Sequence, residues 1–168
     1  ALGIPMDSTP ELRLKSDGGD VVDLGDFEGH VVLVEFWASW CGPCMRALPA
    51  IEEQVNHWQE EGREIVLLAV NTLESGTEGD GPVETGIVRA RRVRKALGFE
   101  APILLDEDEA IAAAWGVKGL PVVFVVDPSG NVVSRIDGHR PGVMDELARA
   151  VESALEEAGA STPRDRGE

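Results

Sequence analysis

The chain has 168 residues, which suits one domain with a sizeable hydrophobic core and leaves too little for two. Hydrophobic residues make up 43% and charged residues 27%, a globular composition that argues against disorder. With 15 Lys and Arg against 31 Asp and Glu, the formal charge is -16, which repels nucleic acid and anionic lipid. Two cysteines are too few for the disulfide framework of a small secreted scaffold, so their spacing carries the information.

Four strands and one helix are predicted in the first half of the chain. The strand segments are residues 12–14, 21–24, 31–37 and 65–70. The first two flank a Gly-rich turn and predict a hairpin, whereas the third has no polar alternation and predicts a central strand covered on both faces. Apolar residues at steps of three and four from Pro43 predict a helix that bends at Pro49 and ends before Gly62. A right-handed crossover through this helix would make the last two strands parallel.

The second half opens with a stretch that predicts an exposed, mobile loop. This stretch, residues 71–86, contains four acidic residues, four glycines and no basic residue. The elements predicted beyond it are a helix over 87–97, a strand over 103–105, a short helix over 108–115, a hairpin of 122–126 with 132–136, and a last helix from Val143. Gly98 and Gly116 are expected to end the first two of these helices.

Strands that alternate with helices and finish in an antiparallel hairpin and a helix predict an α/β fold with a central mixed sheet flanked by helices. We expect residues 1–158 to form a single domain and residues 159–168 to form a flexible C-terminal tail. No segment approaches the roughly 18 consecutive apolar residues of a membrane span, so we expect a soluble chain. An export signal or a membrane tether could lie outside the given chain.

The chemistry is concentrated in Trp40-Cys41-Gly42-Pro43-Cys44, which directly follows the predicted central strand. Two cysteines three positions apart at a helix start place their Cα atoms roughly 5 to 6 Å apart, within disulfide range. Unpaired amides and the positive end of the helix dipole stabilise a thiolate at Cys41 and lower its pKa below the free value of about 8.5. Cys41 is therefore the predicted nucleophile, and Cys44, one turn further in, is the predicted resolving thiol.

A static disulfide or half of a zinc site would use the same spacing. A structural zinc ion needs two further ligands, and these would have to come from a carboxylate or from His30, His57 or His139. Those histidines show no paired spacing, which favours a redox pair.

Beyond these residues the sequence resembles the thioredoxin superfamily over most of its length. The lead-in Phe36-Trp37-Ala38-Ser39-Trp40, Pro49 and the later Gly116-Val117-Lys118-Gly119-Leu120-Pro121 are similar to the TlpA/ResA-like branch of extracytoplasmic thiol-disulfide oxidoreductases. The resemblance implies a thioredoxin fold with an N-terminal β-hairpin and a central helix-strand insert at about residues 71–105. It also implies an enzyme, a protein-disulfide reductase or thiol-disulfide oxidoreductase.

The resemblance assigns roles to individual residues. It implies that Pro121 is a cis-proline that faces the disulfide and offers backbone hydrogen bonds to an extended substrate; the cis form of an X–Pro bond costs only about 0.5 to 1 kcal/mol. Leu120 would touch the active-site sulfurs and restrict access or tune the thiol. Trp40, Gly42 and Pro43 would complete the substrate-binding surface.

Glu35 lies six positions before Cys41 and matches the buried carboxylate that thioredoxins use as a proton acceptor for the resolving cysteine. Burial favours the neutral carboxyl, so its pKa would rise toward the range that is useful near neutrality. Thioredoxin itself has the shorter Asp there. The alternative is a Glu that reaches solvent at a strand edge.

We expect Cys41 to attack a disulfide of an exported protein and Cys44 to resolve the mixed disulfide, with reduction as the favoured direction because the potential of thioredoxin is about -270 mV. Sulfur carries the exchange, so no cofactor and no metal is required. Expected partners are disulfide-bearing client proteins and an upstream protein electron donor, and the chain is expected to be a monomer. Leu120 and Val122 stand where proteins of cytochrome c maturation often carry Thr and Glu, so that role is only suggested.

The residues leave alternatives open for the cellular compartment of the protein and for its functional class. The hairpin and the insert favour an extracytoplasmic location, periplasmic or membrane-anchored facing outward, over a cytoplasmic one, although a general cytosolic thioredoxin would have the same motif. A copper(I) metallochaperone of related fold would hold the ion with Cys41, Cys44 and His139. Copper chaperones of this superfamily generally have three residues between the cysteines, whereas Gly42-Pro43 is the disulfide-exchange pair. A peroxidase fits less well.

Other prominent residues are assigned structural roles. Trp58 and Trp115 are expected in the core, and His57 on the solvent side of its helix. The cations of residues 89–95 are interpreted as a solvated helix face that balances nearby Glu and Asp, with docking of an acidic partner as the alternative. The acids of residues 106–109 are expected at a helix N-terminus.

Overall fold

The computed structural model describes residues 9–74 and 85–161, with side chains up to residue 159. The strands of its five-stranded sheet, in spatial order, are β5 (Ile103–Leu105), β4 (Ile65–Asn71), β3 (Val31–Trp37), β6 (Val122–Val126) and β7 (Val132–Asp137). A separate antiparallel hairpin pairs β1 (Arg13–Lys15) with β2 (Val21–Asp23). The predictions of a mixed sheet and of an N-terminal hairpin are confirmed.

Strand β3 occupies the middle of the sheet. It pairs in parallel with β4 along its whole length and antiparallel with β6 from Val32 to Phe36. Every residue of β3 is buried, as its apolar sequence without alternation predicted. Val31 and Leu33 pack on one face of the sheet, and Val32, Val34 and Phe36 pack on the other.

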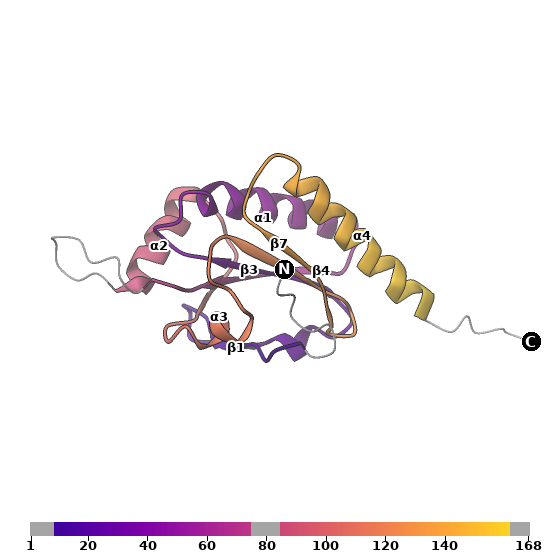
Figure 1. Ribbon diagram of the computed structural model, residues 1–168, viewed down its shortest axis with the longest axis horizontal. Helices are drawn as coiled ribbons and strands as arrows, with labels where there is room; N and C mark the ends of the chain where they lie inside the picture. The colour runs from indigo at the N-terminus through magenta and orange to yellow at the C-terminus, as the bar shows by residue number, and fades with distance from the viewer. Residues whose placement is uncertain (1–8, 75–84, 162–168) are drawn as a thin grey trace, which may run out of the picture.

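Helices α1 (Cys44–Glu60) and α4 (Val143–Ser161) cover one face of the sheet (Figure 1). Their apolar stripes share one core cluster with β3 and β6: Ala47, Ile51, Val55 and Trp58 from α1, and Val143, Leu147, Val151 and Ala154 from α4. Helix α2 (Gly86–Leu97) lies beside α1, where Ala90 packs in a cluster with Leu48. As predicted, α1 continues past Pro49 and ends before Gly62.

The opposite face is covered by the hairpin, by the short 3-10 helix η1 (Leu24–Phe27) and by α3 (Ala110–Ala114) (Figure 1). Trp115 is fully buried there, with ring centroids 5.0 Å from Phe124 and 6.0 Å from Phe36. Trp58 is also buried and the side chain of His57 is exposed. The structural roles predicted for these residues are confirmed.

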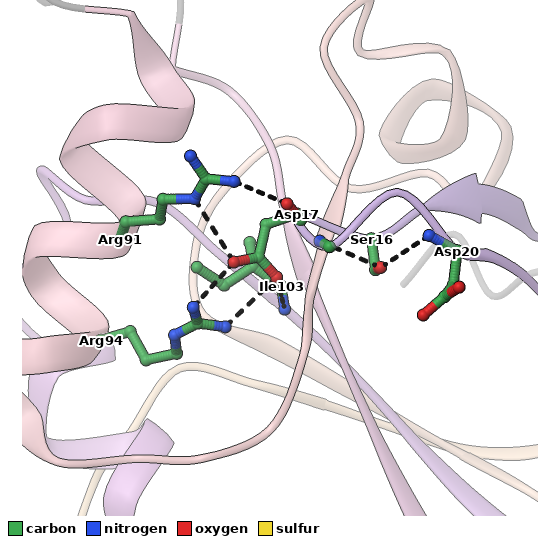
Figure 2. A network of polar contacts seen from close by, with 7 residues as sticks. Ser16, Asp17, Asp20, Arg91, Arg94 and Ile103 are labelled. Atoms are coloured by element: carbon green, nitrogen blue, oxygen red, sulfur yellow. Dashed lines mark hydrogen bonds and ion pairs between the residues drawn. The ribbon is translucent and has the colours of Figure 1, made fainter.

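Asp17, in the turn of the hairpin, joins the hairpin to α2 and β5 (Figure 2). Its carboxylate accepts hydrogen bonds from both Nη atoms of Arg94 (2.7 and 3.2 Å), from Nε of Arg91 (3.4 Å) and from the amide of Ile103 (3.2 Å). Burial opposes ionisation, but the hydrogen bonds from Arg94 and Ile103 outweigh it and hold the pKa of Asp17 below its ordinary value. Arg91 and Arg94 therefore pair with an acid of the same chain while their side chains stay 49% and 28% exposed, which agrees with the interpretation of a solvated helix face that balances nearby acids.

The predicted exposed loop over residues 71–86 is wrong at its beginning. Asn71 is the last residue of β4, and Asn71 and Thr72 are 4% and 1% exposed. Residues 75–84 of that loop lie outside the described residues. At the end of the chain, α4 continues to Ser161 into the predicted tail, and residues 162–168 also lie outside the described residues.

The buried carboxylate of Asp106 binds amides in the first turn of α3. It accepts hydrogen bonds from the amides of Ile111 (3.0 Å) and Ala112 (2.9 Å) and from the hydroxyl of Thr72 (2.8 Å). Helix α3 spans Ala110–Ala114 and is shorter than the predicted span of residues 108–115. The same contacts attach α3 to the segment that follows β4.

We predict that Asp106→Ala destabilises the protein by about 2 to 4 kcal/mol, because two amides and a hydroxyl lose their acceptor in a buried position. Urea unfolding of the oxidised protein measures the change. Glu107→Ala, which alters an exposed neighbouring acid, is the control and should stay within about 0.5 kcal/mol of the parent. Equal stability of the two variants would contradict the role given to Asp106.

Candidate active site

The two cysteines lie where β3 gives way to α1. Residues 38–40 leave the carboxyl end of β3, and Cys44 is the first residue of α1. A disulfide joins Cys41 to Cys44, with the Cα atoms 5.3 Å apart, inside the predicted range. The Cys41 amide donates to the carbonyl of Ala38 (3.2 Å) and closes the turn between strand and helix.

The start of α1 favours negative charge on the sulfur of Cys41. The amide of Cys44 points at Cys41 Sγ across 3.3 Å. In the reduced protein, this amide and the dipole of a 17-residue helix would stabilise a thiolate at Cys41. Cys41 is 3% exposed and Cys44 is 0% exposed, so Cys41 is the cysteine of the pair that offers surface to an approaching disulfide.

The residues expected to bind substrate border the disulfide. The Leu120–Pro121 peptide bond is cis, as the resemblance implied. Leu120 packs against the cluster that contains both cysteines, and Trp40 is 51% exposed. Gly42 and Pro43 are also exposed. Exposed apolar surface and accessible backbone therefore adjoin the disulfide in the chain, which suits an extended polypeptide.

Glu35 is buried in the middle of the sheet, beneath α1. It pairs with Ala69 on β4 and with Val123 on β6, so both neighbouring strands hold its backbone in register. Its side chain is 0% exposed, and neither carboxyl oxygen has a hydrogen-bond partner among the described residues. Burial, with a smaller contribution from the negative charge of Glu52, raises the pKa of Glu35 to about 8. The alternative of a solvent-reaching Glu at a strand edge is wrong.

A small cavity joins Glu35 to the cis-proline side of the site. Its volume is about 10 Å³, at the lower limit of the space that holds one water molecule, and Glu35, Pro121 and His139 line it together with apolar side chains of α1 and α4. His139 also borders a groove of about 420 Å³ that Arg46 and Arg140 share. A buried carboxyl with a perturbed pKa at such a cavity is typical of catalytic sites.

Glu74 contacts the segment that leads into Cys41, although its sequence context predicts only an exposed loop. Its carboxylate accepts hydrogen bonds from the amide and the hydroxyl of Ser39, both 2.6 Å, and from Nδ2 of Asn71 (2.8 Å). Nε1 of Trp40 donates to the carbonyl of Leu73 (2.7 Å). The weak signal available was an acid just past β4, because the parallel strands β3 and β4 end at the same edge of the sheet.

The three histidines lie on separate elements. His30 and His57 approach Glu64 and Glu61 at 4.0 and 3.3 Å, whereas His139 lines the cavity of Glu35. Within residues 9–74 and 85–161, no group of three His, Cys, Asp or Glu side chains is arranged to hold a metal ion. No helix in these ranges has the length and apolar character needed to cross a membrane.

A five-stranded mixed sheet, a disulfide at the start of α1 and a cis-proline directly before β6 define a protein of the thioredoxin fold. Residues 5–135 match the family model described as AhpC/TSA family. The chain belongs to that family, and the resemblance predicted from the sequence is confirmed.

Individual relatives agree with this assignment. The thiol-disulfide oxidoreductase ResA of Bacillus subtilis is 32% identical over 129 residues, which are 77% of this chain and 65% of that protein. ResA of Bacillus anthracis is 30% identical over 122 residues, 73% of this chain and 63% of that protein. The chain thus spans less than two thirds of the length of these curated relatives.

Solved structures share the fold. A Chlorobium tepidum protein provisionally named thiol:disulfide interchange protein DsbE superposes with a TM-score of 0.74 at 28% identity, covering 89% of this chain and 96% of that one. StoA from Bacillus subtilis superposes with a TM-score of 0.65 at 20% identity, covering 84% and 97%.

We predict that Glu35→Gln changes how stability depends on pH. The pKa of this carboxyl is near its ordinary value in the unfolded chain and about 8 in the folded protein. The folding stability that this difference contributes is therefore fully present below about pH 4.5 and is lost as pH rises through 8. Gln stays neutral, so the variant should gain on the parent by roughly 4 to 5 kcal/mol at most between pH 5 and pH 9. Urea unfolding of both oxidised proteins across this range is the measurement, and a pH-independent difference would contradict the assignment.

Proposed function

We propose that this protein is a thiol-disulfide oxidoreductase that exchanges electrons between its cysteine pair and the disulfides of other proteins. The observation that carries the proposal is the Cys41–Cys44 disulfide at the start of α1, with the Cys44 amide 3.3 Å from Cys41 Sγ. The names of the ResA relatives and of the DsbE neighbour support it.

The reaction proceeds through a mixed disulfide. The Cys41 thiolate of the reduced protein attacks one sulfur of a client disulfide, forms a bond to it and releases the other client sulfur as a thiolate, which takes a proton from solvent. Cys44 then loses its proton and attacks Cys41 Sγ. The Cys41–Cys44 disulfide forms, the second client sulfur leaves, and two electrons have passed from the protein to the client.

Glu35 is the proton acceptor for Cys44 in this scheme. A carboxyl with a pKa of about 8 is partly ionised near neutrality and is a stronger base than an exposed carboxylate. Its cavity extends to Pro121, on the side of the site where a client would lie. The room for one water molecule there allows a proton to reach Glu35 without opening the core.

The client binds around the disulfide as an extended segment. Trp40, Gly42 and Pro43 would supply exposed surface, Leu120 packs against the cluster that contains both cysteines, and Pro121 would offer its backbone to the client. From its place against the cysteine cluster, Leu120 would restrict access to Cys41 or tune the thiol, and restricted access would favour clients whose disulfide lies in a flexible or protruding segment.

The partners are disulfide-bearing client proteins and a protein that supplies electrons, and the exchange needs no metal or cofactor because sulfur carries it. Reduction is the expected direction, since thioredoxin, with the same Trp-Cys-Gly-Pro-Cys motif, has a potential of about -270 mV.

An extracytoplasmic location follows from the resemblance to ResA-like proteins, with exported proteins as clients. Cytochrome c maturation is a narrower form of the same activity.

We predict that Cys44→Ser traps clients on Cys41. Without the resolving thiol the mixed disulfide persists, so the variant purified from its native host should carry covalent adducts that dithiothreitol releases. The Cys41→Ser variant is the matched control, because it keeps Cys44 but lacks the proposed nucleophile. Equal amounts of adduct on both variants would contradict the assigned order of attack.

The same preparations separate the alternative functions. The reduced parent should reduce insulin and should not bind copper(I) tightly. Its rate of hydrogen peroxide reduction should not exceed its rate of insulin reduction. Stoichiometric copper binding without insulin reduction would favour a metallochaperone, in which the two thiolates hold the ion. Peroxide turnover without insulin reduction would favour a peroxidase.

We predict that Glu35→Gln slows resolution of the mixed disulfide on the order of 100-fold at pH 8, because Gln cannot accept the Cys44 proton. In the parent, the rate of insulin reduction should rise with pH toward about 8 as Glu35 ionises. In the variant this rise should disappear, and the mixed disulfide should accumulate in rapid-quench experiments. Unchanged turnover with an unchanged pH profile would exclude Glu35 from proton transfer.

A further inference from the structure

We propose that Glu74 is a positioning residue for the disulfide site: it fixes the Ser39–Trp40 segment that presents Cys41, and Arg89 of α2 fixes Glu74. The inference rests on the proposed exchange function. It also assigns a task to the helix that the central insert adds, since α2 then supports the active site directly.

The carboxylate of Glu74 binds Ser39, in the segment that leads into Cys41. Each of its two oxygens accepts a 2.6 Å hydrogen bond from Ser39, one from the amide and one from the hydroxyl. Asn71, buried at the end of β4, donates to the carboxylate as well. The side chain of Glu74 is only 12% exposed, so these charge-assisted bonds are partly shielded from solvent.

The neighbouring residue adds a second attachment. The carbonyl of Leu73 accepts a hydrogen bond from the indole of Trp40 at 2.7 Å. Residues 73 and 74 therefore bind both residues that precede Cys41, Ser39 and Trp40. Leu73 has a φ of 54°, a left-handed conformation that a residue with a branched side chain rarely adopts. Backbone strain of this kind persists where surrounding contacts hold it, often at functional sites.

Position matters here because Cys41 is nearly covered. With 3% of its surface exposed, a small shift of the turn would either bury the sulfur or misalign it for in-line attack. The amide of Cys41 bonds within the turn to Ala38, so the turn moves as a unit with Ser39. A misplacement of about 1 Å can lower a rate on the order of 100-fold.

Arg89 connects Glu74, and through it the Ser39–Trp40 segment, to α2. Its Nη2 donates to the carbonyl of Glu74 at 3.1 Å, and its Nε lies 3.6 Å from the carboxylate. Two residues further along the same helix, Arg91 contacts Asp17 of the hairpin turn (Figure 2). A polar path therefore runs from the hairpin through α2 to the residue before Trp40.

The test compares Glu74→Ala and Glu74→Gln with the parent as full chains. The rate constants for reduction of insulin and of a small aromatic disulfide, 5,5′-dithiobis(2-nitrobenzoate), should fall about tenfold in Glu74→Ala. Glu74→Gln keeps one oxygen to accept the Ser39 amide and should restore most of the rate. Hydrogen exchange of the Trp40 indole, followed by NMR, should accelerate about tenfold in Glu74→Ala while amides of β3 stay protected.

Two matched controls separate positioning from general stability. Asp127→Ala removes a carboxylate that accepts two backbone amides in the β6–β7 turn, at the opposite end of the sheet, and should leave both rates unchanged. Arg89→Ala should reproduce part of the Glu74→Ala loss, whereas Lys95→Ala, which removes an exposed cation from the same helix, should not. Ser39→Ala, which deletes one of the bonds, is the milder variant if Glu74→Ala does not fold.

Rates within twofold of the parent together with an unchanged Trp40 exchange rate, in folded Glu74→Ala or in Ser39→Ala, would overturn the proposal. A loss of rate that Asp127→Ala shares would overturn it too. Failure of the parent itself to reduce insulin would instead refute the proposed function, and the Trp40 exchange measurement would still decide whether Glu74 holds the segment.

Discussion

Strand β3 is hydrogen-bonded along both edges and covered on both faces, and every part of the site takes its position from it. Its carboxyl end delivers Cys41 to the start of α1. The antiparallel neighbour β6 begins directly after Pro121, so the cis-proline arrives at the same edge of the sheet. The parallel neighbour β4 ends opposite Trp37, which brings Glu74 there as well. Three chain segments converge because one strand has neighbours of opposite direction.

The same strand places a carboxyl group where charge is costly. Glu35 faces α1 and α4 across a mainly apolar interface, and its carboxyl oxygens have no hydrogen-bond partner among the described residues. An apolar residue of similar size would be a more stabilising choice at this position. A stable fold that retains such a group favours a functional explanation, and a carboxyl that ionises near pH 8 suits proton exchange with a thiol.

The sequence predicted what depends on local pattern. Apolar runs, glycine stops and the Trp-Cys-Gly-Pro-Cys motif located the strands, most helix ends and the disulfide, because these follow from burial and backbone geometry within a few residues. The cis form of Pro121 needed the family resemblance, since no local rule separates it from a trans proline. Glu74 and Asp17 escaped detection because their partners are distant in sequence: Ser39 lies 35 residues from Glu74 and Arg94 lies 77 residues from Asp17. Acids in glycine-rich stretches look solvated until the tertiary structure supplies their donors.

The cations of α2 show how such distant pairs organise the molecule. Arg89 points to the lead-in of the site, and Arg91 and Arg94 point to the hairpin turn, so one helix binds two acids on different elements. In a chain of charge -16, each buried or half-buried carboxylate adds to the repulsion of the rest unless a cation is nearby. Placing Arg94 against Asp17 and Arg89 against Glu74 relieves that repulsion and fastens the insert to the core in the same contacts. Helix α2 thereby connects the N-terminal hairpin to the turn that carries Cys41. A mixed sheet covered only by α1 and α4 would support that turn from one side.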